Sequence, residues 1–379
     1  MNRLEQHLRD KLAVREQNGI LRMLPKQLTG VDFVSNDYLG LATSGVLDRL
    51  VAERHFVVPG SGSTGSRLLS GNSTFAEELE ARIASFHRAE AALLFNSGYN
   101  ANIGLIVSIA TRDTLIVYDE LCHASIIDGV RLSLAQKRYK FRHNDPADLE
   151  QKLKNADAMC PVIVIVESVY SMDGDMAPLR ELAEICGRYD ASLIVDEAHA
   201  TGVFGTHGEG LVCALNLHDQ IFARVHTFGK ALGCHGAAVA GSNLLRQYLI
   251  NFARPFIYTT ALPGHSIATI AVAYDHLASD EFSTKKLFDN IQYFREKIAA
   301  SGQNNWADSH SPIQACIIGE VAKAKAIAAA LRENGYRMMA ILSPTVPEGK
   351  ERLRVCLHGF NTTEEIDGFF EVMGLVDVK

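Results

Sequence analysis

Five short runs of apolar residues, rich in β-branched side chains, constrain the fold of this 379-residue chain most strongly. The runs are AALLF (91–95), TLIVY (114–118), VIVIV (162–166), SLIV (192–195) and AAVAG (237–241). They are continuous rather than alternating, which is typical of strands covered on both faces. Helical patterns flank or separate them at 74–87, 177–189 and 242–253. This repeated alternation predicts an α/β domain with a mostly parallel sheet.

The predicted organisation has three parts. Residues 1–44 form an N-terminal arm that begins with a charged amphipathic helix, and 45–265 form the large α/β domain. Residues 266–379 combine helical stretches with the strand candidates IQACIIG and RLRVCLHG, which indicates a smaller α+β C-terminal domain.

Composition excludes several classes of function. The net charge is -7 and no run of Lys or Arg occurs, which argues against non-specific binding to nucleic acid. No apolar run reaches the length of a membrane span, and the first residues lack the apolar core of a signal peptide. The seven cysteines are scattered and never spaced C-x-x-C. We therefore expect no disulfide framework, no structural metal site and a cytoplasmic location.

Two glycine-containing segments are candidates for phosphate binding. Asn96-Ser97-Gly98-Tyr99 follows the run AALLF and opens a helical pattern, so free backbone N–H groups there could bind a phosphate. An ordinary strand-to-helix turn has the same pattern. The second segment, PGSGSTGSRLLSGN (59–72), lacks the G-K-[ST] ending of a P-loop, which favours a flexible loop facing a substrate.

Polar residues also follow the next strands, at the sheet edge where open α/β folds bind ligands. His123 comes after TLIVY and could stack on a planar cofactor, or it could cap a helix or be buried as a structural histidine. Ser171 follows VIVIV and suits either a ligand pocket or the turn formed with Asp173-Gly174.

Asp196 and Lys230 point most directly to chemistry. Asp196 ends the run SLIV, where it should be buried and need a partner, and His199 follows three residues later. A protonated pyridine nitrogen is one such partner; Mg²⁺ bound as in a Walker-B motif would require a P-loop, and none is present. Lys230, in VHTFGKALG, has small and apolar neighbours, which favour the free amine over an ordinary surface lysine. The two residues together suggest an enzyme that uses pyridoxal phosphate (PLP).

The order of motifs resembles one enzyme family along nearly the whole chain. The motifs are SNDYLGLA, PGSGSTGSRLLSGN, FNSGYNAN, DELCHASIIDG, ESVYSMDGDMAPL, VDEAHATGVFG, TFGKALG and GAAVAGS. They are similar to those of the α-oxoamine synthases, which are PLP-dependent acyltransferases of fold type I. The resemblance implies a homodimer with active sites at the subunit interface.

The resemblance also implies roles for individual residues. The catalytic set would be Lys230 as the Schiff-base lysine, Asp196 at the pyridine nitrogen, His199 at the phenolic oxygen and His123 stacked on the ring. Further cofactor contacts would come from Ser97, Gly98, Tyr99, Ser171 and Thr227, and, toward the neighbouring subunit's phosphate, from Thr259 and Thr260. Substrate contacts would come from Asn36, Ser66, His123 and Arg354, with Arg354 clamping the carboxylate of the amino acid.

Two places depart from the family pattern. The segment that contains Arg22 is short, so the match of Arg22 to an N-terminal substrate arginine stays open. Beyond Arg354, where related sequences often carry Thr, this chain has Cys356 and His358, which leaves the contacts to the acyl substrate open.

The implied reaction is a decarboxylating Claisen condensation of an amino acid with an acyl thioester. The motif combination favours L-alanine with a pimeloyl thioester, carried by CoA or an acyl carrier protein, in biotin synthesis. Glycine with acetyl-CoA and serine with a long acyl-CoA are the alternatives within the family. A catalytically inactive scaffold or regulatory subunit is the alternative outside it. A nicotinamide dehydrogenase would require a G-x-G-x-x-G turn, which this chain lacks between strand and helix.

Overall fold

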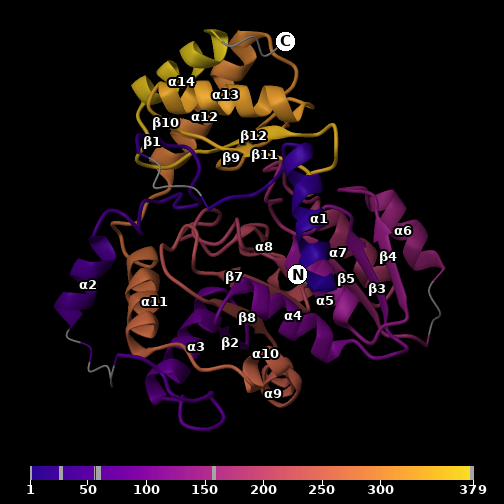
Figure 1. Ribbon diagram of the computed structural model, residues 1–379. Helices are drawn as coiled ribbons and strands as arrows, with labels where there is room; N and C mark the ends of the chain where they lie inside the picture. The colour runs from indigo at the N-terminus through magenta and orange to yellow at the C-terminus, as the bar shows by residue number, and fades with distance from the viewer. Residues whose placement is uncertain (1, 25–28, 55, 57–60, 156–158, 376–379) are drawn as a thin grey trace. The chain divides into compact units, whose positions relative to one another are not determined.

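The computed structural model describes residues 2–24, 29–54, 56, 61–155 and 159–375 (Figure 1). The chain divides into two compact units. The larger unit comprises Asn36–Ser171 and Met176–Thr284, and the smaller comprises Met1–Ser35, Met172–Asp175 and Lys285–Lys379. The domain boundaries expected at 44 and 265 stay a prediction.

The larger unit is built on a seven-stranded sheet with the order β2-β8-β7-β6-β5-β3-β4. The strands are β2 Ala91–Phe95, β3 Leu115–Asp119, β4 Lys137–Phe141, β5 Val162–Glu167, β6 Ala191–Asp196, β7 Ala223–Thr227 and β8 Ala237–Gly241. β8 runs antiparallel to β2 and β7, and the other pairings are parallel. The mostly parallel α/β sheet expected from the sequence is therefore confirmed.

Helices cover both faces of this sheet (Figure 1). One face packs against α4 Gly98–Ile109, α5 Ala124–Leu132, α9 Asn243–Phe252 and α10 Arg254–Ile257. The other packs against α6 Pro146–Lys154, α7 Leu179–Arg188 and α8 Leu211–Ala214. Along β5, Ile163 and Ile165 face the first layer while Val164 and Val166 face the second. Each such side chain contributes about 1.5–3 kcal/mol on burial, which explains the continuous apolar runs.

Two strands of this sheet were missed by the sequence analysis. β4 is an edge strand in which four of five residues, from Lys137 to Lys140, are exposed. Its cations oppose pairing with another chain, and they also hide the apolar signal. β7 lies between β6 and β8, yet it carries the buried polar side chains of Arg224 and His226.

Among the described residues, the larger unit has four further helical segments: α2 Val46–Arg54, α3 Thr74–Phe86, the 3₁₀ helix η1 His218–Gln220 and α11 Gly264–Leu277. Ser73 caps α3 by accepting a hydrogen bond from the Ala76 N–H at 3.2 Å. Such a cap satisfies a backbone donor that the helix itself cannot.

The smaller unit combines helices with short strands. Its helices are α1 Arg3–Gln17, α12 Lys285–Ser301, α13 Val321–Glu333 and α14 Thr363–Leu375. β1 Val31–Asp32 pairs in parallel with β10 Tyr336–Arg337, and β11 Ala340–Ile341, β12 Arg352–Cys356 and β9 Ile313–Ile317 form an antiparallel sheet. The expected N-terminal helix is present, and none of the described residues of α1 is buried.

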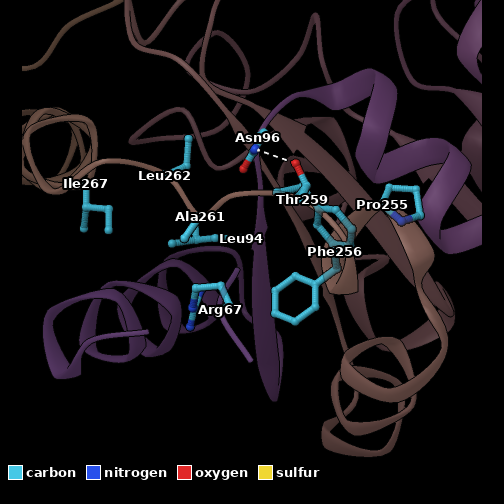
Figure 2. Close-up of a pocket in the computed structure, with 10 residues that line it drawn as sticks. Arg67, Leu94, Asn96, Pro255, Phe256, Thr259, Ala261, Leu262 and Ile267 are labelled. Carbon is cyan, nitrogen blue, oxygen red and sulfur yellow. Dashed lines mark hydrogen bonds between the residues drawn. The ribbon is translucent and has the colours of Figure 1, made fainter. Parts of the chain in front are cut away.

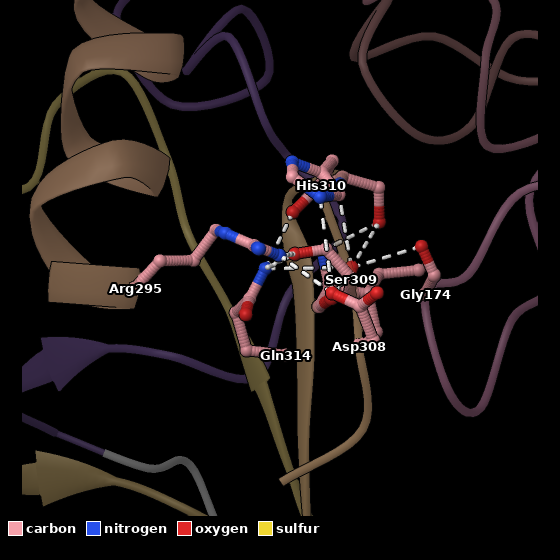
Figure 3. A network of polar contacts seen from close by, with 8 residues as sticks. Gly174, Arg295, Asp308, Ser309, His310 and Gln314 are labelled. Atoms are coloured by element: carbon pink, nitrogen blue, oxygen red, sulfur yellow. Dashed lines mark hydrogen bonds and ion pairs between the residues drawn. The ribbon is translucent and has the colours of Figure 1, made fainter. Parts of the chain in front are cut away.

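A loop that interrupts the larger unit, Met172–Asp175, belongs to the smaller one. The Ser309 hydroxyl donates to the Gly174 carbonyl at 2.9 Å, within a polar network that also includes Arg295 and Gln314 (Figure 3). Arg352 forms an ion pair with Asp173. Gly174 has a φ of 77°, and a Cβ there would lie 2.1 Å from the Ile313 carbonyl oxygen. The loop conformation therefore requires glycine.

Candidate active site

A cavity of about 310 Å³ opens at the carboxyl ends of the sheet strands in the larger unit. Open α/β sheets bind their ligands at this edge. The expected site residues that line the cavity are Asn36, Ser97, Gly98, Tyr99, His123, Asp196, His199, Thr227 and Lys230. The other lining residues are Asn102, Ser125, Glu167, Ala198, Gly229, His235 and Gly236.

The turn between β2 and α4 presents a helix N-terminus to this cavity. Ser97 is the N-cap of α4, and its side chain accepts a hydrogen bond from the Asn100 N–H at 3.2 Å. A Cβ on Gly98 would lie 2.5 Å from Thr227 Cγ2, so the backbone approaches β7 closely. Backbone N–H groups at such a terminus suit an anion. The Tyr99 hydroxyl donates to Asp128 on α5.

Asp196 ends β6 and is buried, 5% exposed. Its Oδ1 accepts a hydrogen bond from the Ala198 N–H at 2.8 Å, and its Oδ2 accepts one from the Asn102 side-chain amide at 2.7 Å. These two donors hold the carboxylate in one orientation. They also provide the hydrogen-bond partners that a buried charged group requires.

A second buried carboxylate, Glu167, ends the neighbouring strand β5. One oxygen accepts a hydrogen bond from the backbone N–H of His123 at 2.5 Å. Burial raises the pKa of Glu167 well above its usual value; the Asp196 charge adds to this effect and Lys230 opposes it. Two carboxylates side by side disfavour a second negative charge.

His123 is the N-cap of α5, and its ring is exposed to the cavity. Desolvation lowers the pKa of His123 from 6.5; Asp196 opposes this shift and Lys230 adds to it. The imidazole is therefore held toward its neutral form. Helix capping and placement in the cavity, which the sequence left as alternatives, occur together in this residue.

His199 is buried beside the cavity and contacts a tyrosine from the beginning of the larger unit. The Tyr38 hydroxyl lies 2.7 Å from His199 Nδ1 and donates to Asn36 Oδ1 at 3.0 Å. Tyr38 has no exposed surface. These contacts fix the position of the His199 ring in the cavity wall.

Lys230 lies in a tight turn between β7 and β8. The Gly233 N–H donates to the Lys230 carbonyl at 2.9 Å, and the Cys234 N–H donates to the Phe228 carbonyl at 2.7 Å. The buried side chains of Phe228, Ala231 and Leu232 anchor the turn. The half-buried Lys230 is thus presented to a cavity that also contains Asp196.

Thr259 and Thr260 are not among the lining residues of this cavity. The Asn96 side-chain amide donates to Thr259 Oγ1 at 3.2 Å and to the Thr260 carbonyl at 2.8 Å. Thr259 lines a neighbouring hollow with Arg67, Phe256 and other residues (Figure 2). The segment is therefore fixed next to Ser97, the residue that follows Asn96.

Ser66 and Ser171 also lie outside the lining set. The Ser66 carbonyl accepts hydrogen bonds from the N–H groups of Leu69 and Gly71 and so closes a turn. Residues 59 and 60 of the glycine-rich segment lie outside the described residues. Ser171 is buried beyond the end of β5.

Arg354 and its neighbours belong to the smaller unit. Arg354 is buried in β12, and its Nη1 lies 2.8 Å from Cys356 Sγ. Burial raises the pKa of the Cys356 thiol, and the Arg354 charge opposes this shift. His358 Nε2 lies 3.0 Å from the Ser35 carbonyl. Arg22 donates to Thr345 Oγ1 at 2.7 Å.

The chemistry of these residues fits PLP. Ser97, Gly98 and Tyr99 supply a helix N-terminus for a phosphate, and a carboxylate, an imidazole and an amine line the same cavity. These groups suit, in turn, a protonated pyridine nitrogen, a phenolic oxygen and an aldehyde. Sequence reasoning gave Glu167 no role, and it also missed Asn102, Ser125 and Tyr38.

Comparison with known proteins defines the class of this chain. The family model for aminotransferase class I and II matches residues 29–372, so the chain belongs to that family. The fold is that of the fold-type I PLP-dependent transferases, as expected from the sequence. Among the described residues, each helix is too short or too polar to cross a bilayer.

Particular relatives narrow the comparison. The 8-amino-7-oxononanoate synthase of Emericella nidulans is 45% identical, over 98% of this chain and 95% of its own length. The structure of 8-amino-7-oxononanoate synthase from Francisella tularensis has a TM-score of 0.77 at 29% identity, covering 91% of this chain and 97% of its own. A serine palmitoyltransferase from S. paucimobilis with a bound PLP–myriocin aldimine has a TM-score of 0.89 at 26% identity, covering all of both chains. These findings confirm the resemblance stated from the motifs.

Proposed function

We propose that this chain is a PLP-dependent acyltransferase that condenses L-alanine with a pimeloyl thioester to give 8-amino-7-oxononanoate, CO₂ and a free thiol, in biotin synthesis. The observation that carries the proposal is that Lys230 and Asp196 line one cavity at the carboxyl edge of the sheet. Identity of 45% to a synthase of that name supports the choice of substrates.

Five groups would hold the cofactor. The N–H groups at the start of α4 would bind its phosphate, together with Thr227, and Asp196 would keep the proton on its pyridine nitrogen. His123 would stack on its ring and His199 would form a hydrogen bond with its phenolic oxygen. When bound, PLP supplies an aldehyde that condenses with amines and a ring that accepts the electron pair of the amino-acid α-carbon.

Lys230 would act twice. Its amine would hold the cofactor between turnovers, and once displaced by the amino acid it would take the proton from the α-carbon as general base. A general base must lie within reach of that proton. Lys230 lines the same cavity as Asp196, which supports this role. The same amine can return the proton after CO₂ has left.

Arg354 would hold the carboxylate of the amino acid. A guanidinium offers two parallel N–H donors to a carboxylate, a geometry that an ammonium group cannot reproduce. Asn36 and Ser66 are proposed as further substrate contacts, and Asn36 lines the cavity.

The test is a comparison of three substrate pairs at matched concentrations, with thiol release and product mass as readouts. The pairs are alanine with a pimeloyl thioester, glycine with acetyl-CoA and serine with palmitoyl-CoA. A pocket that prefers alanine to glycine does so by one methyl group, worth about 1–3 kcal/mol. We expect the first pair to dominate and Lys230→Ala to abolish it. Dominance of another pair would overturn the substrate assignment while leaving the family intact.

The alternative outside the enzymes is an inactive scaffold or regulatory subunit. A scaffold has no need for a buried carboxylate and an amine in one cavity. The purified protein should be yellow and should bleach with borohydride, and a colourless protein that takes up no PLP would support the scaffold instead.

We further propose a homodimer in which Thr259 and Thr260 reach the phosphate in the neighbouring subunit. This proposal rests on the resemblance of the segment IYTTALP to the family; within this chain, Asn96 holds the segment beside Ser97. We also propose that the acyl group is carried by CoA or an acyl carrier protein and that the enzyme is cytoplasmic.

A further inference from the structure

A continuous chain of hydrogen bonds joins the two residues proposed to act on the cofactor ring. Asn102 Nδ2 donates to Asp196 Oδ2 at 2.7 Å and to Ser125 Oγ at 2.9 Å. Ser125 Oγ lies 2.8 Å from His123 Nδ1. Asn102 and Ser125 are each 1% exposed and both line the cavity. The chain therefore runs from the carboxylate to the imidazole through two buried side chains.

The chemistry of the groups fixes the direction of each hydrogen bond. A carboxylate accepts only, so the amide nitrogen of Asn102 must face Asp196, and its second N–H is donated to Ser125. Because Ser125 Oγ accepts there, its own proton is available to His123.

His123 Nδ1 is an acceptor in this chain. The backbone N–H of Ser125 donates to Nδ1 at 3.2 Å, and a backbone amide has no role except donation. A neutral imidazole that accepts at Nδ1 carries its proton at Nε2. His123 is thereby held neutral beside a site in which a second positive charge would repel a protonated pyridine.

We propose that Asn102 and Ser125 are positioning residues that set the Nε2–H tautomer of neutral His123 and aim the Asp196 carboxylate. The inference rests on the proposed function, since it assumes that both residues act on PLP. The Asn102 amide contacts the Asp196 carboxylate directly and His123 through Ser125. One side chain would therefore help to orient both residues that act on the cofactor ring.

The direct test is the ¹⁵N spectrum of the histidine rings, recorded with and without PLP. His123 is assigned by its loss in His123→Asn. We expect the Nε2–H pattern in the parent and a partial admixture of the Nδ1–H tautomer in Ser125→Ala, where the 2.8 Å contact from the hydroxyl is lost and only the longer 3.2 Å backbone hydrogen bond remains at Nδ1. Ser125→Thr restores the hydroxyl and should recover the Nε2–H pattern. Ser133→Ala is the control, because Ser133 is a buried serine at the opposite end of α5, where its hydroxyl donates to the Val130 carbonyl.

The second test measures the dissociation constant of PLP. Without the Asn102 amide the Asp196 carboxylate loses a buried donor and its fixed orientation, so Asn102→Ala should weaken cofactor binding by about tenfold or more. The control is Asn290→Ala, which removes a buried amide that donates to His358 and Asn361 carbonyls in the smaller unit. An Nδ1–H pattern in the parent, or variants that leave tautomer and affinity unchanged, would overturn the inference. Because neither readout involves turnover, failure of the substrate assay alone leaves the inference standing.

Discussion

Among single residues, the charge of Asp196 matters most to the proposed reaction. In Asp196→Asn the shape is kept, yet a neutral amide cannot keep the pyridine nitrogen protonated. We expect the variant to retain PLP and to lose turnover by several orders of magnitude. Cofactor absorbance and thiol release on the same sample measure the two effects.

The matched control is Asp148→Asn. Asp148 is also a buried carboxylate of the larger unit, but it lies in the first turn of α6 and accepts a hydrogen bond from the Arg142 backbone N–H at 2.7 Å. This control should keep its activity. Ordinary turnover in Asp196→Asn would mean that another group manages the ring nitrogen.

A second prediction at this scale concerns pH. His87 stacks on His226 with ring centroids 3.6 Å apart, and both are fully buried. Burial lowers the pKa of His87 from 6.5 to about 3 and that of His226 well below 6.5. Below pH 6.5 the unfolded chain therefore binds protons that the folded chain does not. Stability is complete above this pH and falls as the pH drops toward 3, by about 1.4 kcal/mol per pH unit for each imidazole.

Urea unfolding between pH 7 and 4 tests this prediction. His226→Asn should show a shallower fall in the free energy of unfolding than the parent. His310→Asn is the control, because the His310 side chain is 61% exposed. Parallel pH profiles for the parent and His226→Asn would refute the role of the stacked pair.

Among the secondary-structure elements, two glycines differ in the room they leave for a side chain: Gly174 in the loop Met172–Asp175 and Gly187 in α7. Gly174 has a positive φ and no room for a Cβ, whereas Gly187 lies within α7 with nothing within 4 Å of an added Cβ. Gly174→Ala should destabilise by about 1–3 kcal/mol. Gly187→Ala should stabilise by about 0.5–1 kcal/mol. Opposite shifts of Tm are expected, and shifts of the same sign would contradict this account.

Predictability from sequence also differs among elements. β2 and β8 match the apolar runs residue for residue, because both of their faces are buried and every position must be apolar. β4 escaped because an edge strand can be charged, and β7 because Arg224 is paired inside the protein with the His87 carbonyl. The two-residue strands β1, β10 and β11 carry no periodic signal at all.

The site residues also differ in how easily they can be predicted from the sequence. Asp196 and Lys230 are visible in sequence because each breaks a local rule, a charge within an apolar stretch. Asn102 obeys every local rule of a helix, and its importance arises from contacts 23 and 94 residues away. Such contacts exist only after the sheet has brought β6 beside α4, so no one-dimensional pattern reveals them.

At the scale of the whole molecule, the proposed homodimer predicts a dependence on concentration. If Thr259 and Thr260 complete the neighbouring subunit's phosphate site, dilution should lower activity and release PLP together. Sedimentation and activity measured over the same dilution series test this. A monomer that stays fully active would show that each chain holds a complete site.

Borohydride reduction followed by peptide mass mapping shows whether this chain binds PLP through Lys230. Reduction converts a Schiff base into a stable bond, so the modified lysine can be identified. We predict a single pyridoxyl group on the peptide that contains Lys230, and none in Lys230→Ala. A label on another lysine, or an unlabelled protein after incubation with PLP, would contradict the account.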